Sequence, residues 1–313
     1  MYFPLSGIET NPLVPVLVAF IISFFTSMGG ISGAFLLLPF QVSVLGFNTP
    51  AVSSTNLLYN IISIPGGVYR YIKEGRMLGP LTGIIIIGTI PGVVLGALIR
   101  IHYLQDPKNF KFFVGIVLLY ISIRLLKDIL SPGKDKTKNV SAENKFRKLI
   151  QENHGTDAVH SLVTRVSVKR ISVKELIYDF NEAEFSINVP VLSCVSFFVG
   201  ILGGIYGVGG GAIIAPLLIS LFGLPVYTIA GAALLSTFLT SLIGVGFYQF
   251  FSFYYSVSSI SPDWILGLLF GIGGFAGMYA GAKFQKYFPA NLIKWILFCC
   301  ILFIAVKYII EFI

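Results

Sequence analysis

Residues 207–211 read GVGGG and lie inside an apolar run that extends from residue 189 to residue 222. Glycine lacks a side chain and weakens helices, so this cluster predicts a helix break inside a hydrophobic segment. At the depth of a bilayer, non-helical backbone is tolerated only where protein or a polar cavity covers it. The stretch therefore predicts both a membrane-embedded fold and a candidate site.

A weaker copy of the cluster, GGISG, occupies residues 29–33. In both copies, the apolar stretch that follows contains one proline. Four pairs of residues share a single offset of 177 positions: Gly30 and Gly207, Gly33 and Gly210, Pro39 and Pro216, Gly46 and Gly223. Further along, a shift of two residues aligns Pro65, Gly67 and Tyr69 with Gly244, Gly246 and Tyr248. The sequence therefore predicts an internal repeat of one unit, a pattern typical of secondary transporters.

Composition indicates an integral membrane protein. Hydrophobic residues make up 55% of the 313 positions and charged residues 12%, with a mean hydropathy of +0.85, whereas about a quarter of an ordinary soluble domain is charged. The net charge is +8, but the basic residues lie at the ends of apolar runs and in one loop, which argues against a nucleic-acid partner. Cys194, Cys299 and Cys300 lack the spacing of a zinc site, so we expect neither a metal nor a cofactor.

The apolar segments predict ten helices, five in each half. A hairpin of two short helices at residues 12–28 and 31–45 is followed by spans at residues 50–71, 78–99 and 110–130. The second half repeats this order, with a hairpin at residues 190–222 and spans at residues 225–250, 264–284 and 292–313. We therefore predict an all-α polytopic membrane protein with two repeats, each a broken helical hairpin plus three transmembrane helices.

The number of crossings predicts that the two repeats are inverted. A hairpin returns to the side it left, so each half crosses the membrane a net three times, and an odd number turns the second half over. Basic residues follow the first full span and fill the central loop, and the positive-inside rule assigns that side to the cytoplasm. Arg100, Lys108 and Lys111 fall on the opposite side. We expect a multi-pass cell-membrane protein with a cytoplasmic central loop and both termini outside.

Charge divides the chain into three parts. Of the 36 Asp, Glu, Lys and Arg residues, 18 lie in residues 131–189, which separate a first transmembrane repeat (residues 1–130) from a second (residues 190–313). Within this insertion, residues 142–153 read as a short amphipathic helix, and residues 161–188 alternate as two small strands around Asn181 and Glu182. The insertion reads as a connector between the repeats, with a regulatory domain as the alternative.

A helix that begins just after a glycine cluster exposes its first N–H groups and the positive end of its dipole. Two such helix starts near the membrane centre predict a site for a small anionic substrate. Polar residues of the following span in each half are predicted to face the hairpin: Ser53, Ser54, Thr55, Asn56 and Asn60 in the first, and Ser236, Thr237, Thr240 and Ser241 in the second. The candidate substrate-binding residues are Gly29, Gly30, Ser32, Gly33, Thr55, Asn56, Tyr206, Gly207, Gly209, Gly210, Gly211, Ser236 and Thr237.

Close helix packing is the alternative explanation for any membrane glycine, because small residues let helices approach one another. We assign eight glycines to packing: Gly88, Gly92, Gly96, Gly271, Gly273, Gly274, Gly277 and Gly281. The two clusters are interpreted as sites because they occur at matched positions, each with a downstream proline. None of the 14 acidic residues falls in the middle of a span, and the three histidines lie in loops, which argues against proton relays and intramembrane proteases.

These residues resemble a known family, the sulfite exporter TauE/SafE family. The resemblance rests on residues 203–216, GGIYGVGGGAIIAP, on the weaker copy from Ser27 to Pro39, and on the duplicated layout. It implies a permease for sulfite, organosulfonates and related sulfur-containing anions. The first copy departs from the pattern, with Ser32 and Ala34 where the second has Gly209 and Gly211.

The residues and the resemblance together predict a secondary transporter that exports small sulfur-containing oxyanions and is not an enzyme. Its expected partners are the small anion and the lipid bilayer. An anion channel of the same architecture, in which the clusters form a filter, is the first alternative. An intramembrane enzyme is the second. The oligomeric state stays open.

Overall fold

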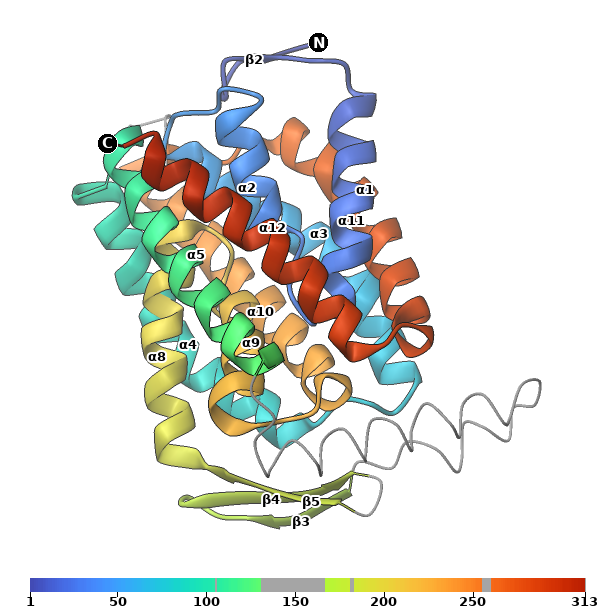
Figure 1. Cartoon of the computed structure of the whole chain (residues 1–313). Coiled ribbons are helices and arrows are strands. Elements are labelled where there is room, and N and C mark those ends of the chain that lie inside the picture. The colour runs from blue at the N-terminus through green and yellow to red at the C-terminus, as the bar shows by residue number, and fades with distance from the viewer. Residues whose placement is uncertain (105, 131–166, 181–182, 255–259, 313) are drawn as a thin grey trace.

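The computed structural model describes residues 1–104, 106–130, 167–180, 183–254 and 260–312. Within these ranges the chain forms ten α-helices, one short 3-10 helix and five short strands (Figure 1). The first half contains α1 (Leu13–Met28), α2 (Ala34–Ser43), α3 (Ala51–Lys73), α4 (Gly79–His102) and α5 (Pro107–Leu130). The second half contains α8 (Val189–Tyr206), α9 (Gly210–Phe222), α10 (Val226–Tyr254), α11 (Trp264–Phe284), η2 (Gln285–Tyr287) and α12 (Ala290–Ile310). The ten predicted helices are confirmed.

Local chemistry explains several helix ends. Asn188 precedes α8 and its side-chain oxygen accepts a hydrogen bond from Val191 N at 3.1 Å, and Asp263 accepts from Leu266 N at 3.1 Å before α11, so both helices begin with a side-chain cap. Gly46 and Gly223 follow the two short hairpin helices with φ of 75° and 61°. This left-handed backbone, which glycine adopts without steric cost, ends α2 and α9 at equivalent positions.

Five helices within the described residues are long and apolar enough to cross a membrane: α4, the stretch Lys108–Lys127 of α5, α8, α10 and α11. Helix α3 has 23 residues, a length of about 34 Å, but its polar residues place it outside this group. Ser53, Asn56 and Asn60 of α3 are fully buried. The polar face of this helix is therefore covered by protein rather than by lipid.

The two halves pack against each other through matched glycine rows. Gly88, Gly92 and Gly96 of α4 lie against the α8 backbone at Ser193, Phe197 and Ile201. Gly273, Gly277 and Gly281 of α11 lie against the α1 backbone at Val16, Phe20 and Phe24. The numbers rise together, so α4 runs parallel to α8 and α11 runs parallel to α1. A Cβ atom at these positions would overlap main-chain carbonyls, which confirms that these glycines serve close packing.

The offset of 177 residues also relates α3 to α10. Reciprocal contacts connect Gly30 with Ala230 and Gly207 with Ser53, and likewise Gly67 with Leu234 and Gly244 with Leu57. Each pair is converted into the other by adding or subtracting 177. The predicted shift of two residues in this region is therefore wrong: Tyr71, rather than the exposed Tyr69, is the buried counterpart of Tyr248.

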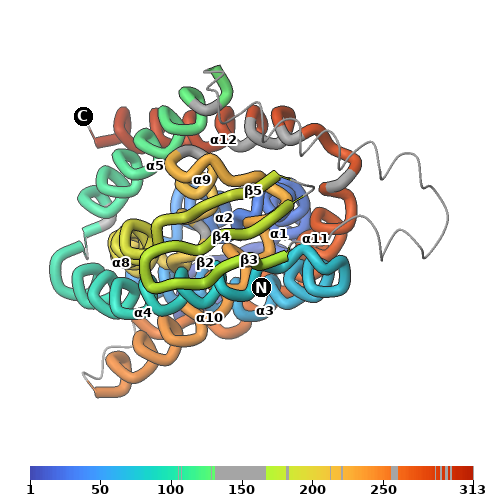
Figure 2. The backbone as a smooth tube through the Cα atoms, turned by 90° about the horizontal axis from the view of Figure 1, so that it is seen from below, coloured from blue at the N-terminus to red at the C-terminus, as the bar shows by residue number. Residues whose placement is uncertain are grey.

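A small sheet covers one end of the helix bundle, which we call the sheet end (Figures 1 and 2). Its antiparallel strands are β3 (Ser167–Ile171), β4 (Glu175–Phe180) and β5 (Ala183–Asn188). Tyr178 Oη lies 3.2 Å from Thr228 Oγ1 at the start of α10 and connects sheet to bundle. Strands occur where two were predicted, but the segment predicted as the first strand contains both β3 and β4. The predicted turn at Asn181 and Glu182 lies outside the described residues. The predicted helix at residues 142–153 lies outside the described residues.

Both chain termini lie at the opposite end of the bundle, which we call the terminal end (Figure 1). Strands β1 (Tyr2–Phe3) and β2 (Ile8–Glu9) pair there. Ser6 N donates to Asp263 Oδ2 at 3.2 Å, and Lys111 Nζ lies 3.0 Å from Glu311 Oε2. The two hairpins lie in the middle of the molecule, with α5 and α12 on one flank and α3 and α10 on the other (Figure 2).

Candidate functional site

The two helix breaks meet at one side chain, Asn60 of α3. The first break is residues 29–33, between α1 and α2, and the second break is residues 207–209, between α8 and α9. Asn60 Nδ2 donates to Val208 O at 3.0 Å and to Ser241 Oγ at 3.1 Å. Ser32 Oγ donates to Asn60 Oδ1. Asn60 therefore couples the first break to the second.

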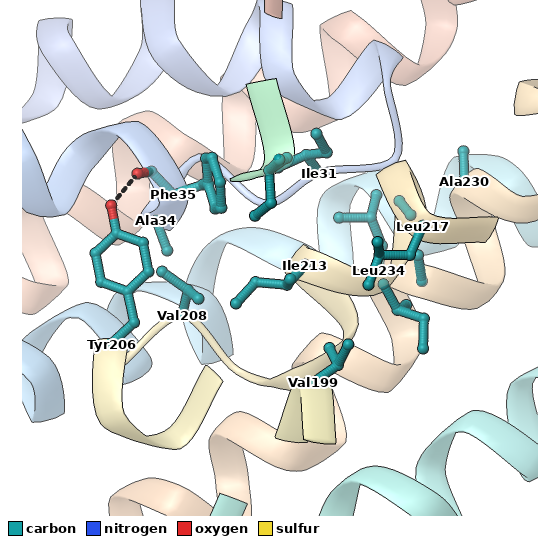
Figure 3. Close-up of a cluster of buried hydrophobic side chains, with 14 of the residues drawn as sticks. Ile31, Ala34, Phe35, Val199, Tyr206, Val208, Ile213, Leu217, Ala230 and Leu234 are labelled. Carbon is teal, nitrogen blue, oxygen red and sulfur yellow. Dashed lines mark hydrogen bonds between the residues drawn. The ribbon is translucent and has the colours of Figure 1, made fainter. Parts of the chain in front are cut away.

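Tyr206 forms a further bridge between the hairpins. Its hydroxyl donates to Phe35 O at 2.8 Å, a bond that crosses from the end of α8 to the start of α2 (Figure 3). Apolar residues from both hairpins, among them Ile31, Val208 and Ile213, pack in the same cluster (Figure 3). The breaks are therefore covered by protein, as membrane-embedded irregular backbone requires.

Left-handed glycines form both breaks. Gly30 has φ of 70°, Gly207 of 75° and Gly209 of 73°, values that side-chain-bearing residues rarely adopt. Hydroxyl groups meet the first N–H of each following helix: Ala34 N donates to Ser32 Oγ and Gly210 N to Thr240 Oγ1, each at 3.2 Å. Both helix starts thus already favour an oxygen acceptor at their positive ends.

The cluster glycines also satisfy a packing requirement. A Cβ atom on Gly209 would lie 2.9 Å from Ser241 Oγ, and one on Gly210 would lie 2.6 Å from Thr89 Cβ. A Cβ atom on Gly211 would likewise overlap Thr237 of α10, and one on Gly33 would overlap Tyr59 of α3. In this conformation the clusters therefore serve close packing of α3, α4 and α10 around the breaks, in addition to any contact with a ligand.

The remaining predicted residues divide into two groups. Asn56 contacts the first hairpin, with Nδ2 donating to Ala34 O at 2.9 Å and Oδ1 accepting from Gln41 Nε2 at 3.2 Å. Ser236 and Thr237 donate to carbonyls of their own helix. Thr55 is turned away from the hairpin, because its Oγ1 accepts from Asp263 N at 2.8 Å. Ser54 also bonds away from the hairpin, with Oγ donating to Ile260 O at 2.8 Å. The expectation that all these residues face the break is not met.

The sequence placed Asn60, Thr240 and Ser241 on the polar face toward the hairpin but not among the candidate binding residues, although the structure brings all three to the breaks. It gave no role at the site to Arg100. Asn60 follows Asn56 by one helical turn, a spacing that identifies it as part of the same polar face. Arg100 is fully buried, with Nε 3.4 Å from Ser53 Oγ and its guanidinium 3.8 Å above the Phe110 ring. Its position near the end of an apolar span suggested only an interfacial anchor.

A dense polar network closes the sheet end below the first break. Gln285 Nε2 donates to Met28 O at 2.5 Å, and Arg76 Nη1 donates to Gln285 Oε1 at 2.6 Å. Tyr71 Oη lies 3.0 Å from Ser27 O and 3.1 Å from Gln285 Oε1. Arg76 Nη2 also pairs with Glu74 Oε2 at 2.5 Å. The last carbonyls of α1 are thereby tied to side chains of both halves.

A mostly helical chain with five apolar helices of spanning length, and two broken hairpins buried side by side, defines a polytopic membrane protein. The family described as "Sulfite exporter TauE/SafE" matches residues 15–308. The chain belongs to this family of membrane transporters.

Two relatives of this chain have names that describe membrane transporters. A stretch of 179 residues, 56% of this chain, is 25% identical to 54% of "Probable membrane transporter protein YunE" from Bacillus subtilis. A shorter stretch of 41 residues, 13% of this chain, is 49% identical to 15% of "Probable membrane transporter protein MJ0441" from Methanocaldococcus jannaschii. The alignment with YunE thus spans about half the length of that relative. No solved structure matches the chain.

Proposed function

We propose that this chain is a secondary transporter that exports small sulfur-containing oxyanions such as sulfite or organosulfonates. The observation that carries the proposal is the meeting of the two breaks at Asn60, where α2 and α9 both begin. A helix start presents N–H groups and a positive dipole end, which together favour an anion. Two such starts at one place give an anion partners from both halves of the chain.

The charge of the surroundings supports an anionic rather than a cationic substrate. Among the described carboxylate side chains, only Asp263 is buried, and it caps α11 at the terminal end. The groups gathered at the breaks are amides, hydroxyls and backbone N–H groups. Neutral donors of this kind favour an oxyanion. A buried carboxylate in their place would disfavour it and would itself be costly to desolvate.

The reciprocal contacts between the halves support an inverted repeat. The packing of α4 on α8 matches that of α11 on α1, while α1 begins at the terminal end and α8 at the sheet end (Figure 1). In this proposal the sheet end faces the cytoplasm and both termini lie outside. Rocking of one hairpin against the other would break the few hydrogen bonds at Asn60 and Tyr206 and open the site to one side at a time.

The proposal is tested by flux measurements in proteoliposomes with labelled sulfite, sulfoacetate, taurine and sulfate. We expect saturable flux of at least one sulfur oxyanion. Flux that rises linearly with concentration to the highest level tested indicates the channel alternative instead. Absence of flux for every anion in reconstituted, folded protein contradicts the proposed function.

Export of an anion should respond to the membrane potential. Moving one charge through 100 mV changes the free energy by about 2.3 kcal/mol, which sustains a concentration ratio of about fifty for a monoanion. We therefore expect efflux to follow an imposed potassium-valinomycin potential. Flux that follows a proton gradient and ignores that potential contradicts electrogenic export.

A further inference from the structure

Arg100 is a fully buried cation near the terminal end of the bundle. Helix α4 runs parallel to α8, which starts at the sheet, so the last turns of α4 lie toward the opposite end. Arg100 follows the packing glycine Gly96 by four residues, as Gln285 follows Gly281 in α11. Arg100 and Gln285 therefore occupy equivalent positions in the two repeats.

The surroundings of Arg100 lead directly to the second break. Its Nε lies 3.4 Å from Ser53 Oγ. Ser53 Oγ in turn lies 3.5 Å from Ile205 O, and the backbone of Ser53 packs against Gly207. Ser53 thus contacts both the guanidinium and the second break.

Two of the three guanidinium nitrogens of Arg100 lack partners among the residues that the structure describes. Nη1 and Nη2 are buried, and neither has a hydrogen-bond partner within the described part of the chain. No carboxylate of those residues forms an ion pair with Arg100. Phe110 covers one face of the guanidinium at 3.8 Å, but the N–H donors point outward in its plane. A buried, unpaired charge is strongly unfavourable and calls for a counter-charge from a ligand.

We propose that Arg100 binds the oxyanion on the terminal side of the second break. Nη1 and Nη2 form a planar pair of donors that matches two oxygens of one sulfite or sulfonate group. The chemical class of the ligand rests on the proposed function, whereas the unpaired charge of Arg100 does not. Arg100 thereby adds the one full positive charge that the neutral donors of the breaks lack.

The test measures anion-induced stabilisation of purified protein. A bound anion raises the melting temperature, Tm, by mass action. We compare sulfite, sulfoacetate and sulfate with sodium gluconate at matched ionic strength, in the wild type, in Arg100→Gln and in Arg124→Gln. Arg124, on α5 beside Tyr120, controls for the loss of one arginine charge. We expect at least one sulfur oxyanion to stabilise the wild type and Arg124→Gln, and the anion affinity of Arg100→Gln to be at least about tenfold weaker.

Two results would overturn the inference: no stabilisation of the wild type by any of the three anions, or full stabilisation of Arg100→Gln. Without added anion, we expect Arg100→Gln to melt no lower than the wild type, because an unpaired buried charge has been removed. If Arg100→Gln does not fold, Arg100→Lys serves instead, since it keeps the charge and loses the planar pair of donors. An oxyanion response in Arg100→Lys equal to that of the wild type then contradicts the assignment.

Flux measurements separate this inference from the proposed function. Saturable flux in the wild type with an unchanged KM in Arg100→Gln contradicts the role of Arg100 and retains the transporter. Absence of flux in the wild type, together with anion stabilisation that depends on Arg100, retains the binding site and contradicts transport.

Discussion

The internal repeat makes the sheet end and the terminal end of the bundle equivalent, yet the buried arginine at each end has different surroundings. At the sheet end, Arg76 is bonded to Glu74 and Gln285 and lies 4.7 Å from the Tyr71 ring. At the terminal end, Arg100 likewise lies over an aromatic ring, but its hydrogen bonding within the described residues is limited to one long contact with Ser53.

This difference separates a structural cation from a candidate binding group. A buried charge that is paired with a carboxylate and hydrogen-bonded, as Arg76 is through Nη1 and Nη2, holds its neighbours in place. A buried charge without partners costs stability, so its presence indicates an interaction outside the folded chain itself. The repeat supplied two equivalent positions, Gln285 and Arg100, and only the first is saturated by protein groups.

The largest effect is expected for Arg76→Ala. The substitution removes the cation that Gln285 and the partly buried Glu74 share. Glu74 keeps its ion pair with Arg70, so we expect a cost of about 3 kcal/mol. Denaturation of purified protein in detergent should therefore show a large decrease in stability, in contrast to Arg100→Gln. Equal destabilisation by the two substitutions would remove the distinction between the two ends.

A second comparison uses the packing glycines, which should respond alike at both ends. Gly92→Leu and Gly277→Leu each force a side chain against a main-chain carbonyl of the neighbouring helix, and we expect a loss of about 1–3 kcal/mol or more in each. Gly246→Leu is the matched control, because nothing lies within 4 Å of a Cβ atom at that position. A control as unstable as the two variants would show that the loss does not come from helix packing, since Leu is the better helix former.

A smaller effect is expected at the tyrosines Tyr71 and Tyr248. Tyr71 Oη donates to Ser27 O at 3.0 Å and Tyr248 Oη to Gly204 O at 3.3 Å, equivalent carbonyls in the last turns of α1 and α8. Replacement of either by Phe should cost about 1 kcal/mol in unfolding free energy. Tyr71→Phe should cost more, since Tyr71 also contacts Gln285. A larger loss in Tyr248→Phe would contradict the view that the sheet end is the more tightly bonded one.

The sequence pattern was sufficient for the helices and the hairpins because both depend on local features. Runs of apolar residues set the spans, and glycine clusters with a downstream proline set the breaks. The left-handed turns at Gly46 and Gly223 follow from the same repeat. The division of the first predicted strand into β3 and β4 was missed, because the five residues of β3 are all exposed and carry no alternation of burial.

The side chains that form the site were harder to predict from the sequence. The direction in which Thr55 points depends on the segment before α11, which is 208 residues away. The burial of Arg100 depends on α3 and α5 packing around the end of α4. Local periodicity does not reveal such long-range contacts, so Thr55 and Arg100 were assigned from their position in a span alone.

The central claim is that substrate passes where the two breaks meet, and Asn60→Ala tests it most directly. The variant loses the hydrogen bonds to Ser32, Val208 and Ser241. Ser54→Ala is the matched control on the same helix, because Ser54 bonds to Ala51 O and Ile260 O away from both breaks.

The measurement is proteoliposome flux of the best sulfur oxyanion, divided by the amount of folded protein. Loss of the hydrogen bonds that Asn60 makes to both breaks should lower the flux of Asn60→Ala at least about tenfold, the equivalent of about 1.4 kcal/mol. The flux of Ser54→Ala should stay near that of the wild type. Wild-type flux per folded molecule in Asn60→Ala would show that the substrate passes elsewhere.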